Sequence, residues 1–251
     1  MPLPIRLLFP TIVLALGAGL GFIHPPGILA AGLFIALTLG GKSLPEWLWY
    51  LLVVLGSLLL AAHLLPGFEP WNLRPARLLS SDATPYVLRL SWDKLLVGST
   101  LLAWWLGQRR ADAVSTRLAL LTAAATLLLV PALALMLGLV GWQVKWPEDL
   151  WLWLLVNLGV AVLAEELLFR GLLQPRLIRL LGLWPGLLGT ALLFGAAHLA
   201  FSPLFALVAA VAGLGYGLAF HYSGRLSLAI ALHGAVNLLH LLLLSYPLRL
   251  A

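Results

Sequence analysis

The chain has 251 residues, of which 62% are hydrophobic and only 10% are charged, with a formal net charge of +6 and a mean hydropathy of +1.04. This balance excludes an ordinary soluble domain and predicts a multi-pass membrane protein. Because cysteine is absent, disulfides, thiolate catalysis and cysteine-based metal sites are excluded.

The apolar runs predict an all-α fold, a polytopic bundle of transmembrane helices, because lipid offers no hydrogen-bond partners to an open sheet. At about 20 residues per crossing, we expect eight or nine spans. The second span (28–41) and the fourth (94–107) are short enough to be re-entrant or interfacial. The first span (5–23) has some character of a signal peptide and is interpreted as a retained helix. The spans lie near 5–23, 28–41, 46–65, 94–107, 117–142, 150–173, 185–201, 204–222 and 226–247.

We expect transmembrane helices over 1–65, a loop or interfacial segment over 66–93, and further transmembrane helices over 94–251. The segment 66–93 suits either an interfacial lid or a solvated loop, and Ser80, Ser81 and Asp82 resemble a helix N-cap before Tyr86. Since the basic residues lie in short loops, the positive charge is explained by topology in a cell membrane, expected to be a bacterial inner membrane, and not by nucleic-acid binding.

Two patterns predict how the spans are anchored and packed. Ala209, Gly213 and Gly217 recur at every fourth position, which predicts a face for close helix approach. Tryptophans fall near span ends, as an aromatic belt at the membrane interface requires. They are Trp47, Trp49, Trp104, Trp105, Trp142, Trp146, Trp151, Trp153 and Trp184.

The span 150–173 carries ionisable side chains, which are costly in lipid and indicate a functional site. Glu166 and Arg170 are four residues apart, so they share a helix face and can pair, whereas Glu165 points about 100° away and is expected to be left without an ion pair. The free carboxylate would handle protons, and its neighbour would be held by the guanidinium.

Two later spans carry the other polar groups. Phe194 and His198 share one face, where His198 could position a water molecule against Glu165 and Phe194 could pack below it. His233, Asn237 and His240 form a polar stripe, and their N–H groups are the kind of donor that stabilises an oxyanion. Outside these motifs, the simplest interpretation of His24, His63 and His221 is hydrogen bonding between neighbouring helices.

The ordered motifs Glu165-Glu166-x-x-x-Arg170, Phe194-x-x-x-His198 and His233-x-x-x-Asn237 resemble those of the CPBP family of intramembrane proteases, which includes the type II CaaX-prenyl endopeptidases and bacterial Abi-type proteins. The resemblance covers roughly 150–240. It implies that Glu165 activates water with the help of His198, that His233 and Asn237 stabilise the oxyanion, and that Glu166 and Arg170 hold these groups in place.

The resemblance leaves the cofactor open between two chemistries. A metal-free mechanism is preferred, because no His-Glu-x-x-His pair lies on one helix and Glu, His and Asn already supply a base and oxyanion donors. The alternative is a zinc-dependent form of the same protease, with His198, His233 and a glutamate as ligands.

The expected partners are the lipid bilayer and a membrane-embedded or lipidated protein or peptide substrate. Resemblance to the prenyl endopeptidases implies removal of a tripeptide from a lipidated tail, whereas the bacterial character of the chain favours a broader class of membrane-anchored substrates. A proton-coupled transporter using Glu165, His198 and His233, and a non-catalytic scaffold, are the competing functions. The sequence does not predict an oligomeric state.

Overall fold

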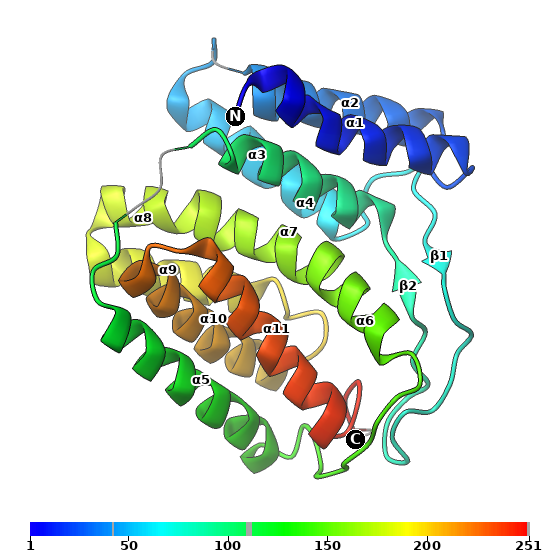
Figure 1. Ribbon diagram of the computed structural model, residues 1–251, viewed down its shortest axis with the longest axis vertical. Coiled ribbons are helices and arrows are strands. Elements are labelled where there is room, and N and C mark those ends of the chain that lie inside the picture. The colour runs from blue at the N-terminus through cyan, green and yellow to red at the C-terminus, as the bar shows by residue number, and fades with distance from the viewer. Residues whose placement is uncertain (42, 109–111, 250–251) are drawn as a thin grey trace. The chain divides into compact units, whose positions relative to one another are not determined.

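The computed structural model describes residues 1–41, 43–108 and 112–249, and it confirms a mostly helical fold (Figure 1). Among these residues, four helical segments are long and apolar enough to cross a membrane: Thr116–Met136, Leu150–Leu181, Pro203–Ser223 and Leu226–Leu243. The remaining apolar helices are shorter, with 14 to 17 residues. The structure therefore supports a membrane protein, but the expectation of eight or nine crossings is not confirmed.

The chain divides into two compact units, which are described separately. The first comprises Met1–Arg74, Arg89–Arg109 and Leu155–Leu168, and the second comprises Pro75–Leu88, Arg110–Leu154 and Phe169–Ala251. The long helical segment Leu150–Leu181 contributes residues to both units.

The first unit is built around α4 (Trp92–Trp105), which packs against α1 (Leu3–Gly19), α2 (Pro25–Gly40) and α3 (Glu46–Ala61). It also contacts the π-helical turn η1 (Asn157–Val162) and the short α7 (Leu163–Glu166). The side chains of Leu96, Val97 and Leu101 are inaccessible to solvent. A two-stranded antiparallel sheet of β1 (Trp71–Asn72) and β2 (Arg89–Leu90) precedes α4.

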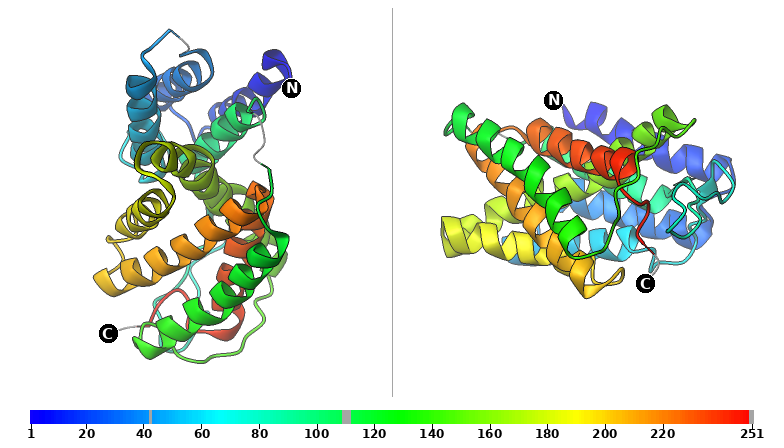
Figure 2. Two further views of the ribbon diagram at one scale, coloured as in Figure 1. Left: turned by 90° about the vertical axis from the view of Figure 1, so that its left-hand side faces the viewer. Right: turned by 90° about the horizontal axis from the view of Figure 1, so that it is seen from below.

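The second unit is built around α10 (Pro203–Ser223), which packs against α5 (Thr116–Met136), α9 (Leu183–Ala196) and α11 (Leu226–Leu243), as Figure 2 shows for α5 and α10. The short α8 (Gln174–Leu181) packs against α9. Ser202 caps α10 by accepting a hydrogen bond from the Phe205 amide, and Gly224 ends it in a left-handed conformation. Exposed leucines on α5, such as Leu128 at 73%, suit contact with lipid.

The helix that carries the glutamate pair differs from the predicted span 150–173. It runs through α6 (Leu150–Val156), η1, α7, a second π-helical turn η2 (Leu167–Leu173) and α8, and so continues past Pro175. Proline lacks an amide hydrogen and usually interrupts a helix, but here it stands in the first turn after η2, where the regular hydrogen-bond ladder has already changed.

The expectation of a helix N-cap at Ser80, Ser81 and Asp82 is wrong, because the segment 75–88 contains no helix. Asp82 instead fastens this segment to the C-terminal part of the second unit. It accepts a hydrogen bond from the Ser245 hydroxyl at 2.7 Å and pairs with Arg249 at 3.2 Å. Interactions across 163 residues of sequence therefore replace the local capping that the pattern predicts.

Candidate active site

Glu165 and Glu166 lie on α7 in the first unit, between the two π-helical turns. Glu166 is fully buried, and 19% of the Glu165 side chain is exposed. The expectation that Glu165 is left without an ion pair is wrong, because the Lys94 ammonium lies 3.5 Å from Glu165 Oε1. The sequence argument considered only residues on the same helix, whereas Lys94 comes from the first turn of α4, which packs against α7.

Asp93 tightens the first turn of α4, next to Lys94. Its side chain is buried and accepts a hydrogen bond from the Lys94 amide at 2.8 Å. The other carboxylate oxygen lies 2.6 Å from His63 Nδ1, just beyond the end of α3. The expectation that His63 hydrogen-bonds to a neighbouring helix is therefore confirmed. The contacts of Asp93 also hold the first turn of α4, from which the Lys94 side chain extends.

Arg170 lies in the second unit and is fully buried. Its Nη2 donates a hydrogen bond to the Gly213 carbonyl at 2.9 Å, and its guanidinium carbon lies 4.4 Å from the centre of the Phe194 ring and 5.2 Å from that of Tyr216. Such distances indicate cation–π contacts, which are strongest where water is excluded. Glu166 belongs to the first unit, so its pairing with Arg170 stays a prediction.

The small residues of α10 explain how Arg170 reaches the helix backbone. A Cβ atom on Gly213 would come within 3.1 Å of the Phe194 ring, and one on Gly217 would come within 2.7 Å of Gln174 Oε1. Gln174 also donates a hydrogen bond to the Gly217 carbonyl at 3.0 Å. The prediction that this stripe is a packing face is confirmed for Gly213 and Gly217, whereas Ala209 lines the pocket described below.

Phe194 is the centre of an aromatic cluster that joins the second and third sequence motifs. Its ring lies 4.8 Å from that of His198 and 5.8 Å, edge to face, from that of His233. Tyr216 stacks on His233 with the ring centres 4.6 Å apart. The expectation that Phe194 packs against His198 is confirmed, and the rings restrict the orientations of both imidazoles.

The hydrogen bonding of His198 assigns its tautomer. Its Nδ1 lies 2.8 Å from the Phe194 carbonyl oxygen. Since a carbonyl can only accept, Nδ1 carries the hydrogen, and Nε2 of the neutral ring is an acceptor. His198 can therefore accept a hydrogen bond from a water molecule, and the same nitrogen could bind a metal ion.

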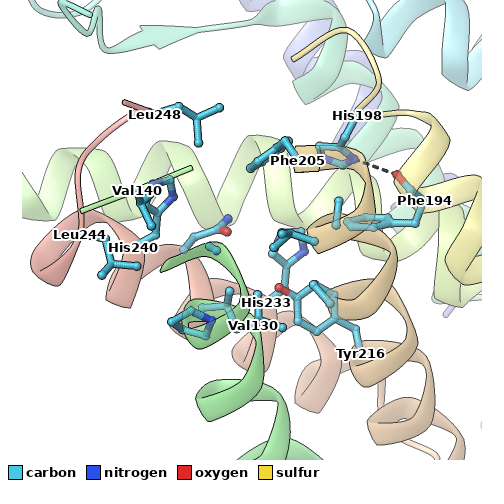
Figure 3. Close-up of a pocket in the computed structure, with 17 residues that line it drawn as sticks. Val130, Val140, Phe194, His198, Phe205, Tyr216, His233, His240, Leu244 and Leu248 are labelled. Carbon is cyan, nitrogen blue, oxygen red and sulfur yellow. Dashed lines mark hydrogen bonds between the residues drawn. The ribbon is translucent and has the colours of Figure 1, made fainter. Parts of the chain in front are cut away.

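His198, His233, Asn237 and His240 line one pocket of the second unit, which holds about 620 Å³ of space including its open mouth (Figure 3). The other walls are largely apolar and include Val130, Val140, Phe205, Leu244 and Leu248. His240 Nε2 donates to the Ser245 carbonyl at 2.9 Å, so this part of the predicted stripe is already used to hold the C-terminal segment. An apolar pocket with a few convergent polar groups is typical of a substrate site.

The second unit thus brings His198, His233 and Asn237 to one pocket and places Arg170 behind Phe194, whereas Glu165 and Glu166 are described within the first unit. In the described part of the chain, no group of three or more histidine, aspartate or glutamate side chains is arranged to hold a metal ion. Lys94 and Tyr216 are the contacts that sequence reasoning missed. Neither belongs to a motif, and only the packing of other helices reveals them.

Residues 147–239 match the family model described as Type II CAAX prenyl endopeptidase Rce1-like. No curated protein and no solved structure matches the chain. The matched residues include all three sequence motifs, and the match ends within α11, which carries the third of them. The resemblance drawn from the motifs is therefore confirmed, and residues 147–239 of the chain are similar to the Rce1-like proteases.

Proposed function

We propose that this protein hydrolyses a peptide bond of a membrane-embedded or lipidated protein by means of a water molecule that Glu165 deprotonates. The hydroxide would attack the scissile carbonyl, and the resulting oxyanion would accept hydrogen bonds from His233 and Asn237. The protonated Glu165 would then deliver its proton to the leaving amine, so the carboxylate is regenerated.

The observation that carries this proposal is the shared pocket of His198, His233 and Asn237 in the second unit. The acceptor nitrogen of His198 suits a water molecule, and an asparagine amide suits a developing negative charge. In the first unit, the Lys94 ammonium lies 3.5 Å from Glu165 Oε1, so the carboxylate of the proposed base is held in position.

The walls of the pocket support the substrate class. Valine, alanine, leucine and phenylalanine side chains form most of its lining, so a substrate segment entering it would be desolvated against apolar surface. The family match implies a prenylated protein substrate in a membrane. We extend this class to other membrane-anchored proteins and peptides, whose apolar segments suit the same walls.

The test compares membrane proteomes by terminal labelling in cells that make the native protein, Glu165→Gln or His198→Ala. New protein termini should appear with the native protein and disappear with both variants, since removal of a general base typically costs about 10²–10⁴ in rate. Glu148→Gln, a change of the same kind at an exposed loop position, is the matched control and should preserve the termini.

Identical termini with native protein and Glu165→Gln would contradict the proposal. Proton flux into proteoliposomes that depends on Glu165, without cleavage of any protein, would instead favour the transporter. The variants should be checked for folding by thermal unfolding, so that loss of activity is not mistaken for loss of structure.

A further inference from the structure

A second, polar cavity lies entirely within the first unit, apart from the pocket of the proposed protease function. The first turn of α1, the last turn of α2, the first turn of α3 and the end of α4 contribute to its walls. It holds about 1000 Å³ of space including its open mouth. The ends of apolar helices lie where a bilayer changes from hydrocarbon to headgroups, so the cavity suits an amphiphile better than a soluble metabolite.

Arg6 supplies the cationic side of this cavity. Its Nη1 donates to the Ala103 carbonyl at 3.0 Å, and its guanidinium lies against Gly107, where any Cβ atom would overlap it. Its buried Nε has no hydrogen-bond partner among the described residues. A guanidinium that is held in place and has an N–H group without a hydrogen-bond partner is suited to binding a phosphate group.

Thr38 provides an independent sign of a ligand site. It is 3% exposed and lines the cavity, yet its hydroxyl has no hydrogen-bond partner among the described residues. Elsewhere, the buried Thr190 hydroxyl donates to a carbonyl of its own helix. A buried hydroxyl without a partner costs stability, and a ligand oxygen would remove that cost.

Another part of the lining suits an ammonium group. Glu46 adds a carboxylate, and the Trp49 and Trp104 rings lie 5.7 Å apart. The Trp49 indole is fixed by its hydrogen bond to the Leu37 carbonyl at 3.0 Å. Tryptophan faces attract cations, and a carboxylate beside them favours a positive charge over a second phosphate.

We propose that this cavity binds a phosphoethanolamine headgroup, with the phosphate at Arg6 and Thr38 and the ammonium at Glu46 and the tryptophans. The chemistry is shared by a lipid headgroup and by free phosphoethanolamine. The lipid is the expected source, because exposed apolar side chains on α1 and α2, such as Leu16 at 54% and Leu33 at 63%, offer contact surface for acyl chains.

The experiment measures lipid retention by native mass spectrometry of the full chain titrated with phosphatidylethanolamine, phosphatidylglycerol or free phosphoethanolamine. The native protein should retain phosphatidylethanolamine in preference to phosphatidylglycerol. Arg6→Gln should weaken retention of phosphatidylethanolamine about tenfold, the change expected from one lost charge-assisted contact. Arg117→Gln, at an exposed arginine in the first turn of α5, is the matched control and should retain the lipid.

Thr38→Val tests the site without removing a charge. It should weaken retention of phosphatidylethanolamine and leave the lipid-free protein at least as stable, because the variant no longer buries a hydroxyl without a partner. Equal retention of the two lipids, or retention unchanged in both Arg6→Gln and Thr38→Val, would overturn the proposal. Saturation by free phosphoethanolamine at the same concentration as the lipid would overturn the lipid source. Glu165→Gln should bind the lipid normally, which separates this inference from the proposed protease function.

Discussion

Replacing Arg170 with lysine should destabilise the protein although it keeps the charge. The arginine donates a hydrogen bond to Gly213 and lies over the rings of Phe194 and Tyr216, all at a fully buried position. A hydrogen bond to a charged group contributes about 1.5–3 kcal/mol, and a desolvated cation–π contact contributes about 2 kcal/mol. A lysine ammonium is compact and cannot reproduce the planar contacts and the carbonyl bond together.

We therefore expect a loss of about 2–3 kcal/mol, since lysine should retain part of the interaction. For a chain of this size, such a loss corresponds to a fall of about 4–12 °C in the melting temperature. The assay is thermal unfolding in detergent, followed by proteolytic activity below the transition. Activity should also fall, because Phe194 supports the imidazoles of His198 and His233.

The matched control is Arg179→Lys, at an exposed position of the neighbouring α8. Exposed charge-conserving changes normally alter stability by less than about 0.5 kcal/mol. Equal melting temperatures for the Arg170 and Arg179 variants would refute the reasoning, because they would show that the contacts of the buried guanidinium contribute no stability.

Three further outcomes follow from the same structure. Lys94→Met should lower the turnover rate, and Lys94→Arg should preserve most of it, because Lys94 acts through its ion pair with Glu165. In a protein that already carries Glu165→Gln, Lys94→Met should therefore cause no further loss of turnover. An additive loss in the double variant would contradict a role through Glu165. Chelators should leave proteolysis unchanged, and inactivation that zinc reverses would favour the zinc-dependent alternative. Burial lowers the pKa of Lys145 below the usual lysine value, although the nearby Asp82 carboxylate acts in the opposite direction. The unfolded chain therefore binds this proton more tightly than the folded protein does. The free energy of unfolding should rise as the pH increases from the lowered pKa of the folded protein towards the usual lysine pKa. Thermal unfolding at neutral and alkaline pH should show a smaller rise in Lys145→Gln, and equal pH dependence in the two proteins would contradict this assignment.

The sequence predicted where the helices lie because apolar runs are directly visible in it. The runs near 204–222 and 226–247 correspond closely to α10 and α11, although the second helix ends at Leu243. The motifs predicted the polar lining of the pocket well, since His198, His233 and Asn237 all face it. His233 and Asn237 are four residues apart on α11, so their shared face follows from the geometry of a single helix, whereas the approach of His198 to them depends on tertiary packing.

Contacts between distant segments could not be predicted in this way. Lys94 and Glu165 are 71 residues apart, and nothing in the local pattern of either residue indicates the other. The aromatic surroundings of Arg170 also depend on how α9 and α10 pack beside it. The π-helical turns escaped prediction because an apolar run looks the same in an α-helix and in a π-helix.

The two π-helical turns make the spacing of residues along this helix as important as their identity. Each turn accommodates residues that would be out of phase in a continuous α-helix, and α7 lies between them. Deleting a residue of α7 ahead of the glutamate pair, such as Ala164, would rotate the pair by about 100° relative to the start of the helix. Evolution of this protein should therefore tolerate changes of length in its loops but hardly any between Asn157 and Leu173, where an insertion or deletion would redirect the carboxylates even with every motif residue retained.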